Sequence, residues 1–294
     1  MTAMHRVKAK GILSPKNGMN LYRGCSHGCI YCDSRSKCYN MQHDFEDIEI
    51  KENAIELLET ALKRKRKKCM IGTGAMTDPY IPLETELQNV RKALSLIYEN
   101  GFGFTVITKS NRMLRDMDLL QKINEKTKCV VQMTLTTADE DLCRKIEPNV
   151  STTKERFEVL KQMRDAGIPT VVWLSPILPF INDTWENISS ILDMCIEAKV
   201  YGIICFDMGV TLRDGNREYF YSQLDKLFPG LKEKYIRIYG NQYIISSPDN
   251  KRLMKLFGEK CDEYGIVHNN DLIFEYLHTF EEKQSAEQMS LWDL

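Results

Sequence analysis

Short apolar runs alternate with longer amphipathic segments along most of the chain, and this alternation restricts the fold more than any other feature. The runs are four residues long and rich in β-branched and apolar side chains, as buried strands of a parallel sheet are. Six candidate strands lie at 19–22, 70–73, 104–107, 130–133, 170–173 and 203–206. Helices are predicted between them at about 53–66, 85–100, 114–125, 152–166 and 185–199. This order predicts an α/β fold with a parallel sheet and right-handed crossovers.

The same alternation suits a barrel and an open doubly wound sheet, so periodicity alone does not choose between them. In both folds the chemistry gathers at the carboxyl ends of the strands. The chain has 294 residues and no obvious linker or internal repeat. We expect a core at 1–210, an α/β extension packed on it at 211–280, and a flexible tail at 281–294.

Composition narrows the possible partners and the compartment. There are 40 basic and 41 acidic residues, so no overall positive charge marks the chain for nucleic acid or an anionic membrane. The first ten residues lack the apolar core of a signal peptide, and no stretch approaches the roughly 20 apolar residues that span a bilayer. We therefore expect a cytoplasmic protein without a membrane partner. In that reducing compartment, clustered members of its ten cysteines indicate metal binding or catalysis.

Three cysteines are clustered directly after the first candidate strand. Cys25, Cys29 and Cys32 form a Cys-x3-Cys-x2-Cys triplet in a loop that also contains Gly24 and Gly28. Such a loop can bind three irons of a [4Fe–4S] cluster and leave the fourth iron open. An open iron can chelate S-adenosylmethionine (SAM), and electron transfer to its sulfonium would release a 5′-deoxyadenosyl radical. The alternatives are a zinc site, which normally has four protein ligands, and three unrelated buried thiols.

The triplet resembles the signature of the radical SAM superfamily, and its surroundings are similar to the spore photoproduct lyase-like branch, often labelled DNA repair photolyase. The resemblance runs from about Lys10 to Ile266. The matching segments are RGCSHGCIYC, TDPYIPLE, VITKSN, MTLTTADE, IEPNVSTTKERFEVLKQMRDAGIPT and SPILPFINDT. The resemblance implies a partial (β/α)6 radical SAM barrel with a C-terminal helical extension, with SAM across the strand ends.

The resemblance also implies roles for five residues. Tyr31 would contact the adenine region, although packing against the cluster is an alternative. Thr77 and Asp78 would hold the methionine amino group, and Lys109 and Thr134 would bind the methionine carboxylate or the ribose. These residue types can make such hydrogen bonds and ion pairs. The alternative for Asp78 is a turn or helix cap, and for Lys109 a solvated loop lysine.

Two departures from spore photoproduct lyases concern the return of a hydrogen atom to the substrate. Those enzymes carry a hydrogen-donating cysteine at the position of Ala75 and a tyrosine at the position of Asp33. Neither alanine nor aspartate supplies a hydrogen atom readily, so spore photoproduct repair is not the expected reaction, and the catalytic residues are not identified. Cys205 is a candidate substitute donor, with a buried core thiol as the favoured alternative.

Two further features lie away from this motif. The basic run 63–68 is interpreted as the solvated end of the first crossover helix, on the face opposite the cysteines, rather than as a nucleic-acid site. The chain ends with Gln288, Leu291 and Trp292 in an arrangement that resembles the short peptide by which proteins bind the bacterial sliding clamp. The alternative is that Leu291 and Trp292 dock on their own domain.

Three functions therefore compete. The leading one is a radical SAM enzyme acting on DNA or another nucleic acid, with an electron donor such as flavodoxin or ferredoxin. The second is radical modification of a protein or small molecule. The third is an iron–sulfur electron carrier that never cleaves SAM, which Asp78 and Lys109 disfavour because an electron carrier needs no clamp for an amino acid.

Overall fold

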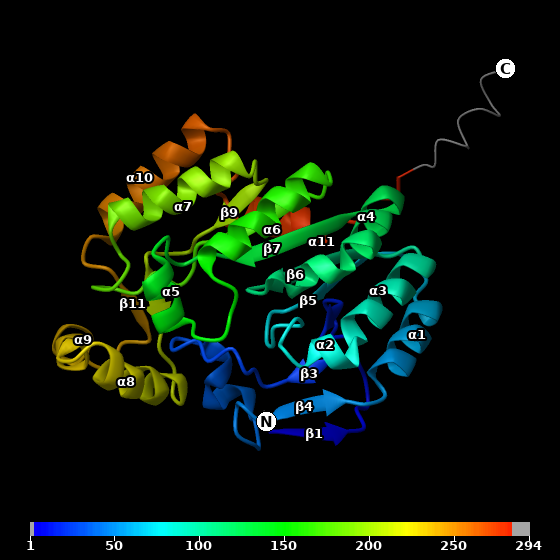
Figure 1. Ribbon diagram of the computed structural model, residues 1–294, viewed down its shortest axis with the longest axis horizontal. Coiled ribbons are helices and arrows are strands. Elements are labelled where there is room, and N and C mark those ends of the chain that lie inside the picture. The colour runs from blue at the N-terminus through cyan, green and yellow to red at the C-terminus, as the bar shows by residue number, and fades with distance from the viewer. Residues whose placement is uncertain (1–2, 284–294) are drawn as a thin grey trace.

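The computed structural model describes residues 3–283 and has a six-stranded parallel sheet at its centre (Figure 1). The strand order is β2, β5, β6, β7, β8, β9, and neighbouring strands are parallel throughout. The strands are β2 (Gly18–Met19), β5 (Met70–Thr73), β6 (Gly103–Thr108), β7 (Cys129–Thr134), β8 (Thr170–Trp173) and β9 (Gly202–Ile204). β2 and β9 do not pair, but residues of β2 and β8 line one cavity, so the sheet curls into a partial barrel. This confirms the predicted fold class.

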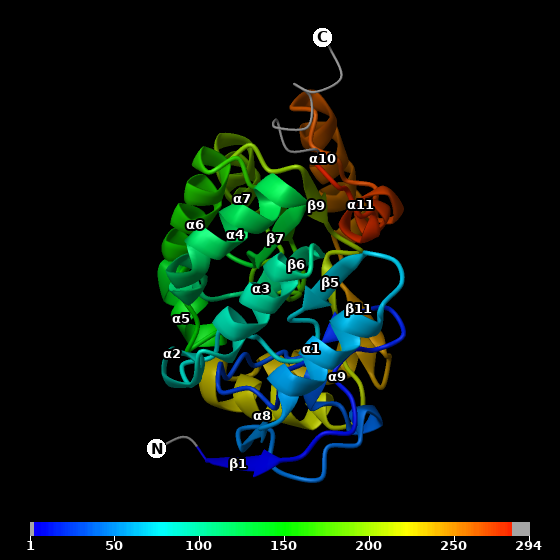
Figure 2. The same ribbon diagram turned by 90° about the vertical axis from the view of Figure 1, so that its right-hand side faces the viewer.

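Amphipathic helices cover the outer face of the sheet. They are α1 (Ala54–Arg64), α2 (Glu84–Leu87), α3 (Asn89–Glu99), α4 (Met117–Lys126), α5 (Glu140–Ile146), α6 (Thr153–Asp165) and α7 (Trp185–Glu197). Three 3-10 helices lie at Asp33–Arg35, Lys37–Tyr39 and Asn111–Asp116. Figure 2 shows α3, α4, α6 and α7 on one side of the strands. Their apolar stripes and the sheet bury one large core, which contains residues such as Leu58, Leu94 and Leu160.

The first predicted strand is wrong in one respect. Residues 19–22 do not form a single strand, because the chain turns at Asn20 and Leu21 between two sheets. Gly18 and Met19 join the barrel, whereas Tyr22 and Arg23 form β3 (Tyr22–Arg23) in a second sheet. That sheet has the order β1 (Met4–Val7), β4 (Ile48–Lys51), β3, with β1 and β4 parallel.

The C-terminal part packs on the open side of the barrel. It contains the hairpin β10 (Gly209–Thr211) and β11 (Ile244–Ser246), and the helices α8 (Asn216–Leu227), α9 (Leu231–Tyr239), α10 (Asn250–Glu263) and α11 (Asn270–His278). A second apolar cluster joins Phe220 and Tyr235 of this part to Ile30 and Tyr31 of the cysteine loop. The predicted boundary at 210 falls inside β10, because apolar contacts continue across it.

Two surface features complete the fold. The basic run 63–68 lies at the solvent-exposed end of α1, at the amino end of β5, as predicted. No helix in the described part of the chain combines the length and apolarity that a bilayer crossing requires.

Candidate functional site

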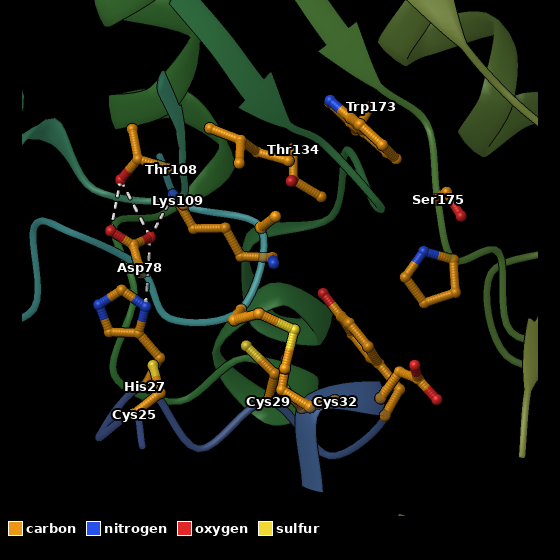
Figure 3. Close-up of a pocket in the computed structure, with 18 of the residues that line it drawn as sticks. Cys25, His27, Cys29, Cys32, Asp78, Thr108, Lys109, Thr134, Trp173 and Ser175 are labelled. Atoms are coloured by element: carbon orange, nitrogen blue, oxygen red, sulfur yellow. Dashed lines mark hydrogen bonds and ion pairs between the residues drawn. The ribbon is translucent and has the colours of Figure 1, made fainter. Parts of the chain in front are cut away.

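The carboxyl ends of the barrel strands and the cysteine loop enclose a cavity of about 290 Å³ (Figure 3). Cys25, Cys29 and Cys32 all line it. The predicted residues Tyr31, Asp78, Lys109 and Thr134 line the same cavity, together with Thr108, Trp173, Ser175 and residues 74–76 of the loop after β5. The structure therefore brings the cysteine triplet and four of the five predicted SAM-binding residues to one place.

Backbone hydrogen bonds from two distant segments hold the cysteine loop. The Cys25 amide donates to the Phe45 carbonyl at 2.9 Å, and the Ile30 amide donates to the Ile146 carbonyl at 3.0 Å. Gly24 has φ of +85°, and a Cβ atom on it would lie 2.6 Å from the Phe45 oxygen. The loop is thus fixed before any cofactor binds, which lowers the entropic cost of placing three ligands.

The three cysteines suit a bound metal cluster. None forms a disulfide, and Cys25 and Cys29 are buried. Burial, followed by the nearby Asp78 carboxylate, raises the pKa of the Cys25 thiol to about 12. Burial likewise raises the pKa of Cys29 well above its ordinary value. Without a bound metal, these two thiols would therefore stay protonated, and iron would have to displace their protons on binding.

Asp78 connects the segments around the cavity through hydrogen bonds. Its Oδ1 accepts from the Tyr80 amide at 2.8 Å and from the Thr108 hydroxyl at 2.8 Å, and its Oδ2 accepts from the Lys109 amide at 2.7 Å. His27 Nδ1 lies 3.5 Å from Oδ2. The carboxylate therefore joins the loop after β5 to the end of β6 and to the cysteine loop (Figure 3). Its contact with the methionine amino group stays a prediction.

Two predicted positions lie elsewhere. Thr77 is buried and lines a separate hollow with Tyr22, Arg23 and Met41, because the loop turns its side chain away from the cavity at this residue. The proposed contact between Thr77 and the amino group of SAM therefore has no geometric support. Cys205 is also buried, and its Sγ lies 3.8 Å from the Met254 sulfur outside the cavity. This placement fits the favoured alternative of a core thiol.

Lys109 supplies a positive charge inside the cavity. Burial lowers the pKa of its ammonium group, but Cys29, in the thiolate form that a bound cluster would give it, and the Glu147 carboxylate outweigh that effect and raise the pKa. The side chain therefore keeps its charge, and Nζ lies 5.8 Å from the centre of the Tyr31 ring. A charged donor in a closed site is suited to a carboxylate ligand.

A buried network that the sequence did not predict lies beneath the cavity. The Tyr31 hydroxyl donates to Glu147, and Glu147 forms an ion pair with Arg156. Arg156 Nη1 donates to the Thr134 carbonyl at 2.7 Å. The network thus connects the cysteine loop to the end of β7. Because its hydroxyl is engaged by Glu147, Tyr31 presents its ring to the cavity.

A second cavity of about 440 Å³ adjoins the first inside the barrel. Ala75, Met76, Ile107 and Trp173 line both. The second cavity has largely apolar walls, with a polar strip in which Trp173 Nε1 donates to Gln132 Oε1 at 2.8 Å. The two cavities therefore share one wall, a feature that no local sequence signal predicted.

Comparison with known proteins identifies the family. The model of the Radical SAM superfamily matches residues 19–195. An uncharacterized protein of Mycobacterium tuberculosis is 27% identical over 246 residues, which cover 81% of this chain and 71% of that protein. An uncharacterized protein of Methanocaldococcus jannaschii is 31% identical over 186 residues, covering 60% and 69%.

Among solved structures, a spore photoproduct lyase variant is similar over 89% of this chain and 79% of its own, with a TM-score of 0.66 and 14% sequence identity. This similarity shows a shared fold, in agreement with the expected branch. The family model covers more than half of the chain and includes the cysteine triplet. The chain therefore belongs to the radical SAM superfamily, whose cofactors are a [4Fe–4S] cluster and SAM.

Proposed function

We propose that this radical SAM enzyme acts on a base of a nucleic acid. The observation that carries the proposal is a group of three aromatic side chains at the open edge of the barrel, formed by Trp173, Phe206 and Phe274. The ring centre of Trp173 lies 6.3 Å from that of Phe206 and 6.0 Å from that of Phe274, and Phe206 is 59% exposed. Each base that stacks on an aromatic side chain contributes about 1–3 kcal/mol to binding.

This aromatic group stands where a substrate would enter. Trp173 lines both cavities, Phe274 lines the second, and Phe206 lines a neighbouring hollow with Ser175 and Pro176, which also line the first cavity. A planar ring held here would be adjacent to the space above the cysteines.

Different residues would hold the cluster, bind SAM and position the SAM-binding side chain. When bound, the cluster supplies the electron that cleaves SAM into methionine and a 5′-deoxyadenosyl radical. Cys25, Cys29 and Cys32 would hold the cluster, and Lys109 would bind the methionine carboxylate. Asp78 keeps the Lys109 backbone in place through the amide hydrogen bond.

The proposed reaction does not return hydrogen from a protein thiol. Ala75 lines both cavities at the position where spore photoproduct lyases carry their donor cysteine. Among the residues that the structure describes, the cavity-lining cysteines are Cys25, Cys29 and Cys32 alone, which the cluster would occupy. The reaction class that we propose therefore differs from spore photoproduct repair, although the fold is similar.

The test measures 5′-deoxyadenosine formed by anaerobic, cluster-loaded protein with SAM and dithionite. We expect single-stranded DNA, duplex DNA or RNA to increase the rate more than an unrelated protein or free nucleosides do. Phe206→Ala should reduce this stimulation, whereas Tyr264→Ala, which removes an exposed aromatic ring outside the cavities, should not. Stimulation by none of the nucleic acids would contradict the proposal and favour a protein or small-molecule substrate. No 5′-deoxyadenosine under any condition would favour an electron carrier.

A further inference from the structure

Three potential metal ligands meet at the three-stranded sheet, away from the cysteine cavity, and a fourth lies beside one of them. His5 lies on β1, His43 and Asp47 lie in the segment before β4, and Glu49 lies on β4. The ligand atoms of His5, His43 and Asp47 are all within 4.8 Å of one another, and among residues 3–283 no other group of three His, Cys, Asp or Glu side chains is as close. β1 and β4 run side by side near the N-terminus (Figure 1).

One hydrogen bond of the His43 ring leaves its Nε2 atom available to bind a metal. His43 Nδ1 lies 3.0 Å from the Asp44 carbonyl oxygen, which accepts hydrogen bonds and cannot donate them. Nδ1 must therefore carry the proton in the neutral ring, and Nε2 has a free lone pair. Nε2 is buried and has no hydrogen-bond partner among the described residues. A backbone carbonyl on Nδ1 with a free Nε2 is the usual arrangement of a metal-binding histidine.

Two of the distances suit a tetrahedral ion, and Glu49, which lies outside the group whose ligand atoms are all within 4.8 Å, would have to turn its carboxylate toward the other three residues. Ligands about 2.1 Å from zinc are about 3.4 Å apart along each edge of a tetrahedron. His5 Nδ1 lies 3.0 Å from Asp47 Oδ2, and His43 Nε2 lies 3.7 Å from Glu49 Oε2, so two edges are close to this length. Two carboxylates and two neutral imidazoles would also balance the charge of a divalent ion.

We infer that His5, His43 and Asp47 bind one zinc ion, with Glu49, beside His43, as the fourth ligand once its carboxylate turns toward the ion. Four protein ligands close the coordination sphere, which is typical of a structural site and leaves no position for a substrate. Zinc fits better than calcium or magnesium, because those ions prefer all-oxygen ligands.

The alternative is a pair of independent histidine–carboxylate contacts. It accounts for His5 with Asp47, whose separation is that of a hydrogen bond. It does not account for His43 Nε2, because 3.7 Å from Glu49 is too long for a hydrogen bond and leaves a buried nitrogen unsatisfied. A metal ion would give His43 Nε2 a partner and would bind His5 and Asp47 at the same time.

The site has a structural consequence for the cysteine loop. Phe45, between His43 and Asp47, accepts the hydrogen bond from the Cys25 amide at 2.9 Å. A zinc ion that holds His43 and Asp47, two residues to either side of Phe45, would fix the Phe45 carbonyl and thereby the position of Cys25.

The experiment counts zinc and iron per chain in the cluster-loaded protein after dialysis, so that iron reports the [4Fe–4S] cluster and zinc cannot occupy the cysteines. We expect about one zinc per chain in the wild type. His43→Asn keeps a side-chain donor for the Asp44 carbonyl and removes the ligand nitrogen, so zinc should fall about tenfold or more. His268→Ala is the matched control, since His268 also contacts a carboxylate, Asp262, at 2.9 Å but has no second histidine; it should keep its zinc.

Equal zinc in the wild type and His43→Asn, or none in the wild type after growth with added zinc, would overturn the inference. If His43→Asn fails to fold, Glu49→Gln takes its place, and zinc retained at the wild-type level there would have the same meaning. As a second readout, a zinc chelator should lower the Tm of the wild type and leave that of the variant unchanged.

Discussion

The ion pair between Glu147 and Arg156 lies wholly inside the protein, with 0% exposure of either side chain. Removing two charges from water is costly, and only close contacts with further hydrogen bonds compensate for it. Both groups have such contacts, because Glu147 also accepts from Tyr31, and Arg156 also donates to the Thr134 carbonyl. Burial raises the pKa of Glu147, but Arg156 and then Lys109 lower it by more, so the carboxylate stays charged.

Glu147→Gln should therefore lower the free energy of unfolding by about 3–5 kcal/mol, because it leaves the Arg156 charge buried and unpaired. A folded-state pKa below the unfolded value stabilises the protein above the unfolded value of about 4.3. The difference between wild type and variant should thus be constant down to about pH 5 and shrink as the pH falls through the lowered pKa. Urea unfolding of the cluster-free protein at several pH values measures this difference in the free energy of unfolding. Asp141→Asn, at an exposed ion pair with Arg144, should leave stability unchanged.

Lys109 places a charge where SAM is expected to bind. Lys109→Met keeps the length of the side chain and removes the charge-assisted hydrogen bond, so SAM binding should weaken by about 1.5–3 kcal/mol. Equilibrium dialysis with cluster-loaded protein provides the measurement. Lys92→Met, at an exposed position on α3, should bind SAM like the wild type. An unchanged affinity in Lys109→Met would remove this residue from the SAM site.

The cysteine triplet allows a direct assignment of ligands. Replacing Cys25, Cys29 or Cys32 by alanine should abolish the brown chromophore or make it unstable, since each thiolate holds one iron. The same replacement at Cys38, Cys69 or Cys261, none of which lines the cavity, should leave iron content and absorbance unchanged. Full clusters in the first three variants would show that other residues hold the iron.

At the scale of elements, the turn between β3 and the cysteine loop depends on one glycine. Gly24→Ala would force a positive φ on alanine, at a cost of about 1–2 kcal/mol, and would also press its Cβ against the Phe45 oxygen at 2.6 Å. Gly167→Ala is the matched control, because Gly167 has φ of +68° but no atom within 4 Å of the added Cβ. Iron per chain should fall in Gly24→Ala and stay normal in Gly167→Ala. Equal iron in both would mean that the loop accommodates the contact.

Sequence patterns predicted the central elements well because those elements form from local signals. The run 70–73 became β5 and the run 170–173 became β8 with the predicted bounds, since both strands are buried and bounded by turns. β1 escaped prediction because its side chains are only partly buried and its partner β4 lies more than 40 residues away. The split of 19–22 also depends on which strand each half meets, and no local pattern carries that information.

The candidate functional site shows the same contrast between features set by local sequence and features set by long-range contacts. The cysteine triplet was predictable because its three ligands and both glycines lie within nine residues of one loop. The direction of Thr77 was not, because it depends on how the loop after β5 turns. Glu147 and Arg156 belong to a segment that matches the family, but their burial and pairing appear only once α6 packs against β7.

At the scale of the whole molecule, the two ends of the barrel strands have different surroundings. The cysteine cavity lies at the carboxyl ends. The last described residues lie at the amino ends, where Glu281 pairs with Lys128 just before β7 and the Lys283 amide donates to the Lys126 carbonyl at 3.1 Å. The predicted tail begins at residue 281, and residues 281–283 make these contacts, whereas its other residues lie outside the described part of the chain. The predicted clamp-binding residues Gln288, Leu291 and Trp292 lie outside the described residues.

The last described residue, Lys283, lies on the face of the barrel away from the cavity. We predict that the protein binds a bacterial sliding clamp through residues 288–294, with Leu291 and Trp292 as apolar anchors in a surface pocket. Deleting 288–294 should abolish clamp binding and leave iron content and SAM cleavage unchanged. Short anchors of this kind bind at about micromolar Kd, or about −8 kcal/mol, so titration calorimetry with a peptide covering 284–294 is the appropriate measurement. A peptide with Leu291 and Trp292 replaced by alanine is the control. No heat from the native peptide at tens of micromolar would refute the clamp interaction without affecting the assignment to the radical SAM superfamily, because that assignment depends on residues 19–195.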